Sequence, residues 1–138
     1  MSRIPSQREY EEREYKEFKR QLLSTLELSK KDKLEARAEL LEALRNDPKL
    51  VAQRINWMID GNYGYGAYRQ AWSLIDRPRA NRAAWMVQTI GALEWQVYPN
   101  DVVTLWKQLT PSQKQRLEEE VKKVIHEAAE DEERPVFD

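Results

Sequence analysis

Apolar residues recur at intervals of three and four along most of this chain. Such spacing places them on one face of an α-helix, whereas a half-buried β-strand would show strict alternation. No credible run of alternation occurs. The pattern therefore predicts an all-α protein, in which residues 1–138 form a single compact, irregular bundle of six to seven helices.

The first predicted helix, about residues 6–28, carries its apolar stripe mainly in its second half. Residues of the first half are mostly Glu and Arg and have almost nothing to bury. We expect residues 1–14 to project into solvent, to fray or to contact a partner, and a homodimer through this helix is one such contact. The stripe consists of Tyr15, Phe18, Leu22 and Leu26.

Short polar signals predict where the remaining helices begin and end. Asp47 is suited to cap a helix that starts at Pro48, since proline lacks only an N–H that would be unpaired there. Gly61 suits a left-handed helix stop. Ser29 with Asp32, and Thr110 with Gln113, resemble capping boxes, and Asn100 is suited to cap a short helix. The predicted helices cover residues 30–45, 48–60, 66–76, 80–97, 100–109 and 111–130.

The same periodicity predicts which side chains face the core. The helix at 80–97 is so apolar that we expect it to be central and packed on more than one side. Residues 131–138 are expected to be a mobile acidic tail. The predicted inward faces include Leu34, Ala38, Leu41 and Leu44; Val51, Ile55, Met58 and Ile59; Tyr68, Ala71, Trp72 and Ile75; Ala83, Val87, Ile90, Leu93 and Val97; and Leu117, Val121, Val124 and Ala128.

Composition excludes several classes of function. The chain has no cysteine, which removes disulfides, thiolate metal sites and cysteine nucleophiles. Its net charge of −1 provides no global field for non-specific nucleic-acid binding. No apolar run is long enough for a membrane span, and the charged N-terminus does not resemble a signal peptide. We therefore expect a soluble, cytoplasmic protein.

No catalytic constellation stands out. His126, the only histidine, lies off the apolar stripe of its helix and is expected to be exposed. The carboxylates show no metal-binding spacing. We therefore predict no catalytic residues, no metal site, no cofactor and no enzymatic activity.

The most distinctive stretch is Asp60–Tyr68, which holds three of the four glycines and three of the six tyrosines. All five tryptophans lie between Trp57 and Trp106, and we expect most of them in the core. Tyr63 and Tyr65 differ, because they lie in a loop that neither flanking helical face accounts for. Since binding residues concentrate on loops held by a rigid scaffold, Tyr63, Gly64 and Tyr65 are the predicted partner-binding site.

Basic residues near this loop support an alternative. Backbone N–H groups around Gly64 and Gly66 are suited to cradle an anion at a helix start, unless these glycines serve only the turn and close helix approach. Helices 48–60 and 66–76 offer a weaker resemblance to a helix-turn-helix. The arginines suited to contact phosphate are Arg69, Arg77, Arg79 and Arg82, although the last three are also suited to pair simply with Asp76 or Glu94.

The sequence therefore favours a non-enzymatic protein–protein interaction module that presents the Tyr/Gly loop. In size and composition it is similar to small intracellular, phage-borne or mobile-element-borne regulators and inhibitors. The alternative hypothesis is a nucleic-acid-binding or phosphate-binding protein that uses a local arginine patch. Neither hypothesis identifies the partner.

Overall fold

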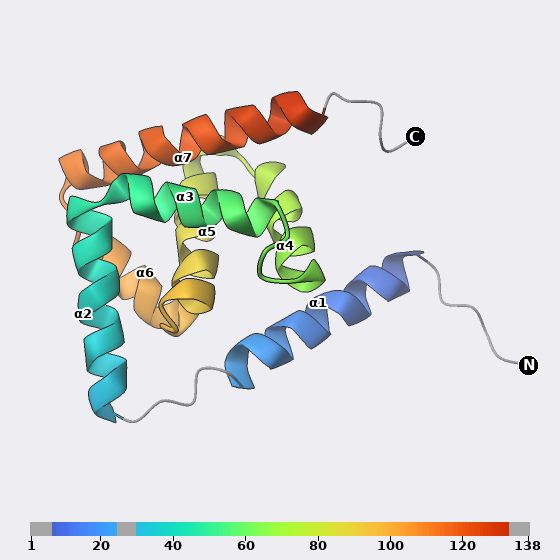
Figure 1. Cartoon of the computed structure of the whole chain (residues 1–138), viewed down its shortest axis with the longest axis horizontal. Coiled ribbons are helices and arrows are strands. Elements are labelled where there is room, and N and C mark those ends of the chain that lie inside the picture. The colour runs from blue at the N-terminus through green and yellow to red at the C-terminus, as the bar shows by residue number, and fades with distance from the viewer. Residues whose placement is uncertain (1–6, 25–29, 133–138) are drawn as a thin grey trace, which may run out of the picture.

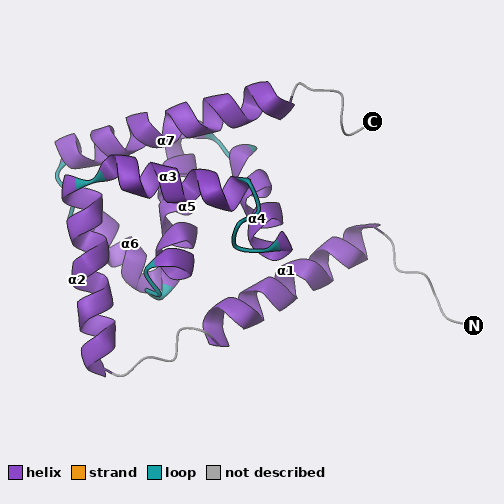
Figure 2. Cartoon of the chain, in the orientation of Figure 1, coloured by secondary structure: helices purple, strands orange, loops and turns teal. Residues whose placement is uncertain are grey.

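The computed structural model of this chain describes residues 7–24 and 30–132. Over these residues the regular structure consists of seven helices and no strand, which confirms the predicted all-α bundle. Short loops connect the helices from α2 onward (Figure 2). The helices are α1 Gln7–Ser24, α2 Lys30–Asn46, α3 Pro48–Ile59, α4 Tyr65–Ile75, α5 Arg79–Glu94, α6 Pro99–Lys107 and α7 Pro111–Glu132.

Two of the predicted helix starts are confirmed in atomic detail. The Asp47 carboxylate accepts a hydrogen bond from the Leu50 N–H at 3.3 Å, and Pro48 occupies the first turn of α3. At α7 the Thr110 N–H donates to Gln113 Oε1 at 2.9 Å, and the Gln113 N–H donates to Thr110 Oγ1 at 3.2 Å. This reciprocal pair is a capping box, and it satisfies two N–H groups that the helix itself leaves unpaired.

Other predicted boundaries need correction. Asn100 does not cap α6, because Pro99 already starts the helix and Tyr98 is the capping residue, without a side-chain hydrogen bond. The helix predicted at 80–97 ends early, at Glu94, and Gln96, two residues later, adopts a φ of 56°. Val97 is nevertheless buried, and its N–H donates to the Gly91 carbonyl at 3.1 Å. The tail predicted at residues 131–138 starts too early, because residues 131 and 132 belong to α7; the rest of it, and Ser29 of the predicted capping box, lie outside the described residues.

Helices α3 and α5 form the centre of the bundle. Helix α3 contacts α2, α4, α5 and α7, and α5 contacts α3, α4, α6 and α7, so the prediction of a central α5 is confirmed. Figure 1 shows α7 running alongside α3, with α2 nearly perpendicular to both and α5 and α6 behind. The two central helices therefore position every other element except α1.

Most of the predicted inward faces are buried. All four apolar residues predicted on α3 face the core, and each contributes roughly 1.5–3 kcal/mol relative to an exposed position. On α7 the side chain of Ile125 is more buried than that of Val124, one residue off the predicted stripe. The predicted side chains that are buried in α3, α4, α5 and α7 are Val51, Ile55, Met58, Ile59, Ala71, Ile75, Ala83, Val87, Ile90, Leu117, Val121 and Ala128.

The predicted inward face of α2 is right only in the C-terminal half of the helix. Leu44 is buried and Leu41 packs, partly buried, against the core, as predicted, whereas Leu34 is 56% exposed and Ala38 is exposed. Leu40 and Ala43, which were not predicted to face inward, are also buried. Helix α2 carries apolar residues on two adjacent stripes, so periodicity fits either orientation. The buried stripe is the one that contains Leu40, Ala43 and Leu44, and α2 contacts α3, α6 and α7, so these neighbouring helices determine which stripe is buried.

Helix α1 packs along α4 at the edge of the bundle (Figure 1). Phe18 is its buried anchor, and it lies directly on Gly66, where an added Cβ would be 2.8 Å from the Phe18 Cβ. Tyr15, predicted to face inward, is instead exposed beside Lys19. The Leu22 side chain and Leu26 lie outside the described part of the chain. The charged first half of α1 is held by an ion pair from Glu11 to Arg69 at 2.6 Å.

Candidate partner-binding surface

The loop between α3 and α4 has a defined backbone. Gly61, with a φ of 87°, donates its N–H to the Met58 carbonyl, and the Asn62 N–H donates to the Trp57 carbonyl at 3.0 Å. These two bonds form a Schellman motif, which confirms the predicted role of Gly61 as the helix stop. Gly64, with a φ of 102°, caps α4 and donates its N–H to the Gly61 carbonyl. The loop is therefore a fixed turn.

Tyr63 is fastened to the bundle by its hydroxyl group. That O–H donates to Glu94 Oε2 at 2.5 Å, and Glu94 Oε1 lies 3.3 Å from Arg54 Nε. The ring packs against the core cluster. Burial, together with the hydrogen bond to Glu94 and the charge of Glu94, raises the pKa of Tyr63 well above its usual range, and Arg54 opposes this shift. Tyr63 therefore ties the loop to the C-terminal end of α5.

Tyr65 points outward from the first position of α4. It is 52% exposed, and its ring stacks against Tyr68 with centroids 6.4 Å apart. The Arg69 guanidinium lies 5.7 Å from the Tyr65 ring centroid, and Arg69 Nη1 donates to the Tyr65 hydroxyl at 3.2 Å. Tyr63 therefore lies outside both flanking helices, as expected, and is held by α5, whereas the expectation is wrong for Tyr65, which begins α4.

Trp57 is a second exposed aromatic residue beside this loop, and sequence reasoning missed it. Its side chain is 39% exposed, and the Arg54 guanidinium lies 4.0 Å from its ring centroid. Trp57 falls off the buried stripe of α3, and this position was the signal available in the sequence. Three tryptophans, Trp72, Trp95 and Trp106, pack against the core as expected, whereas Trp57 and Trp85 are exposed.

The predicted arginine patch is divided by the fold. Arg69 pairs with Glu11 and contacts Tyr65, on the side of α4 that α1 covers. Arg77 lies over the exposed Trp85 ring, 4.5 Å from its centroid. Arg82 and Arg79 follow on the first turns of α5, where Arg82 Nε donates to the Arg77 carbonyl at 2.9 Å. Three of the four arginines thus gather around the turn from α4 to α5.

The glycines serve the backbone and close packing. The Gly64 N–H is already bonded within the turn, and Gly66 lies beneath Phe18 of α1. Both glycines are therefore explained by the turn and by close helix packing, and the Gly64 N–H is not free for an anion. Glu94, an alternative partner predicted for Arg77, Arg79 and Arg82, bonds to Arg54 and Tyr63 instead.

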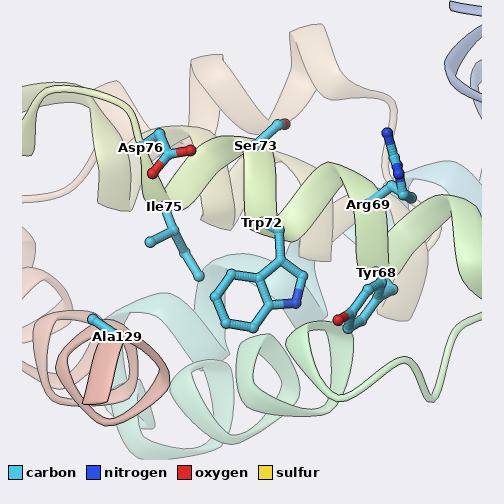
Figure 3. A pocket seen from close by; sticks show the side chains of 7 residues that line it. All are labelled: Tyr68, Arg69, Trp72, Ser73, Ile75, Asp76 and Ala129. Atoms are coloured by element: carbon cyan, nitrogen blue, oxygen red, sulfur yellow. The ribbon is translucent and has the colours of Figure 1, made fainter. Parts of the chain in front are cut away.

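A pocket of about 470 Å³ separates α4 from the C-terminal half of α7. Figure 3 shows the Trp72 indole across this pocket, with its nitrogen turned toward Tyr68. Trp72 Nε1 is buried without a hydrogen-bond partner among the described residues, and the Tyr68 ring meets the indole edge-on, with centroids 6.1 Å apart. An N–H directed at an aromatic ring is a weak stabilising contact.

His126 is exposed and lies 3.0 Å from Glu130 on the same helix, as expected for a surface residue. Within residues 7–24 and 30–132, no group of three or more His, Asp or Glu side chains has the arrangement of a metal site. No helix in that part of the chain is long and apolar enough to cross a bilayer.

Comparisons with known proteins add no further assignment. No protein-family model, curated protein or solved structure matches this chain.

Proposed function

We propose that this protein is a protein–protein interaction module whose binding surface consists of Trp57, the turn at residues 60–64 and Tyr65. We call this the loop surface. The observation that carries the proposal is the pairing of two exposed aromatic rings with two arginines on the helices α3 and α4 that flank a hydrogen-bonded turn. Arg54 lies over Trp57 and Arg69 lies over Tyr65.

This composition suits the centre of an interface. Trp, Tyr and Arg are the residues most enriched among binding hot spots, because a large ring buries much area at a small cost in side-chain entropy. Trp57 and Tyr65 are also among the largest exposed apolar side chains of the described residues. A stable interface buries about 800 Å² per partner, so these rings supply its centre, and surrounding polar side chains supply its rim.

Tyr63 has a supporting role in this proposal. Its hydrogen bond to Glu94 and the Schellman turn hold the loop in one conformation before a partner arrives. Preorganisation of this kind strengthens binding, since less conformational entropy is lost on association. The proposed contact residues are therefore Trp57 and Tyr65, while Tyr63 and Gly64 position them.

Photo-crosslinking tests the proposal directly. A photoreactive amino acid at Asn62, which is exposed in the turn, should crosslink a defined protein in the source cell. The combined Trp57→Ala and Tyr65→Ala substitutions should abolish that crosslink and weaken binding of the purified partner at least about 10-fold to 30-fold, the usual loss for a hot spot.

Trp85 provides a matched control. It is 40% exposed and also lies under an arginine, but it belongs to α5, about 13 Å along the helix from Glu94. Trp85→Ala should leave the crosslink and the affinity unchanged. Equal loss in both variants, or full binding by the Trp57/Tyr65 variant, would contradict the proposal.

A nucleic-acid contact through the arginines has less support. Arg69 is engaged with Glu11, and Arg77 lies against Trp85. Helix α4, the reading helix of a helix-turn-helix, carries α1 on one face. Binding to phosphates would weaken steeply with rising salt, so a steep salt dependence of reversible binding to an oligonucleotide would favour that alternative.

A further inference from the structure

A second surface lies on another part of the bundle, between the first turns of α5 and the C-terminal half of α7. It is a groove of about 360 Å³. Helix α7 contributes residues at successive turns, and α5 contributes its N-terminal end. The lining residues are Arg79, Arg82, Ala83, Glu118, Val121, Lys122, Ile125, His126 and Ala129.

The groove has an apolar floor and a basic rim. Ala83, Val121 and Ile125 form the floor, and each is buried to more than nine-tenths. Above them Arg79 on α5 and Lys122 on α7 are both exposed. A ligand that fills this groove must therefore offer apolar side chains to the floor and negative charge to the rim.

The local charge differs from that of the whole chain. Three cations, Arg79, Arg82 and Lys122, and one carboxylate, Glu118, line the groove, so three less one leaves +2 with His126 neutral. The whole chain carries −1. The first turn of α5 has no acidic residue and no side-chain cap, so its helix dipole adds to the positive field.

We propose that this groove binds an acidic amphipathic helix of a partner protein. From Glu118 to Ala129 the groove follows α7 for roughly 16 Å, which matches about three turns of a docked helix. Apolar residues at helical spacing on the ligand meet Val121 and Ile125, and glutamates or aspartates beside them meet the basic rim. This is the helix-in-groove mode of recognition.

The floor favours a peptide over a nucleic acid. A phosphate backbone pairs with the rim cations but gains little from aliphatic side chains, and base stacking is strongest on the large rings of Trp, Tyr and Phe, none of which is among the described residues that line this groove. Arg82 uses one N–H donor on the Arg77 carbonyl, which orients its guanidinium and leaves the others for a carboxylate. The proposal does not depend on the loop surface.

A designed peptide tests the groove with the full chain. The probe is a fluorescein-labelled helix of about 14 residues, with leucines at i, i+4 and i+7 and glutamates beside them. Fluorescence anisotropy should show saturable binding. Combined Arg79→Glu and Arg82→Glu substitutions should raise its Kd at least about 10-fold, since two favourable charge contacts become repulsive.

Controls separate this mode from general attraction between opposite charges. Combined Lys49→Glu and Lys107→Glu substitutions change the net charge equally at exposed positions outside the groove and should leave the Kd within about 2-fold. The Trp57→Ala and Tyr65→Ala substitutions should also leave it unchanged, so failure here is distinguishable from failure of the loop surface. Circular dichroism confirms that each variant is folded.

Several results would overturn the proposal. One is an absence of binding by the amphipathic peptide. Another is equal binding of a scrambled peptide with the same composition, which would show that the floor contributes nothing. Preference for a single-stranded oligonucleotide over the peptide would assign the groove to nucleic acid, and an unchanged Kd in the Arg79/Arg82 variant would place the peptide elsewhere.

Discussion

The hydrogen bond from Tyr63 to Glu94 makes the rigidity of the loop measurable. Tyr63→Phe keeps the ring that packs on the core and removes only the O–H that donates at 2.5 Å. Glu94 then retains Arg54 as its partner. The variant therefore isolates one contact between the turn and α5, 31 residues away in sequence.

The expected loss of stability is modest but well defined. A hydrogen bond to a charged group contributes about 1.5–3 kcal/mol, and Glu94 is partly exposed and keeps its ion pair, so we expect about 1–2 kcal/mol. For a chain of this length that corresponds to a decrease in melting temperature of about 3–8 °C. The m-value of urea unfolding should not change, because the exposed surface is the same.

The loss should also depend on pH. The raised pKa means that Tyr63 binds its proton more tightly in the folded than in the unfolded chain. Below the ordinary tyrosine pKa of about 10 the stabilisation by Tyr63 is complete. Above this pH the unfolded chain ionises first, and the free energy of unfolding decreases by up to about 1.4 kcal/mol per pH unit. Wild type and Tyr63→Phe should therefore converge near pH 11.

Urea unfolding followed by circular dichroism at pH 7, 9, 10 and 11 measures both effects. The contributions of all groups other than residue 63 are common to both proteins and cancel in the difference. Tyr65→Phe is the control, since its exposed hydroxyl only accepts a bond from Arg69, and it should cost less than about 0.5 kcal/mol. Equal stability at pH 7, or a difference that stays constant through pH 11, would refute the reasoning.

Two further substitutions test the packing of α1 and α2. Gly66→Ala places a Cβ against Phe18, and this overpacking costs about 1–3 kcal/mol and should loosen α1 from α4. Hydrogen exchange should then be faster across residues 7–24. Unchanged protection of these residues would contradict the close contact between α1 and α4. Leu40→Ala should lower the free energy of unfolding by about 2–5 kcal/mol, whereas Leu34→Ala, at an exposed position on the same helix, should change it by less than about 0.5 kcal/mol. Comparable losses for the two variants in urea unfolding would mean that the buried face of α2 is wrongly assigned.

Helix boundaries were predictable because their causes are local. Asp47 with Pro48, Thr110 with Gln113, and Gly61 act on backbone groups within a few residues, and the structure contains each of these bonds. Local rules failed where two helix-start signals lie on neighbouring residues, as at the start of α6. There Pro99 starts the helix before Asn100 can cap it.

Orientation required the tertiary structure. Two apolar stripes run along α2, and only contact with neighbouring helices selects the one that contains Leu40. Tyr63 and Tyr65 look equivalent in sequence, yet Tyr63 hydrogen-bonds to Glu94 of α5, whereas Tyr65 is exposed. Likewise Lys122 and Ile125 join Arg79 only because α7 crosses the start of α5. Sequence alone determined the helices and the unusual loop, since those depend on near neighbours; which side chains remain free to bind depends on residues brought together by folding.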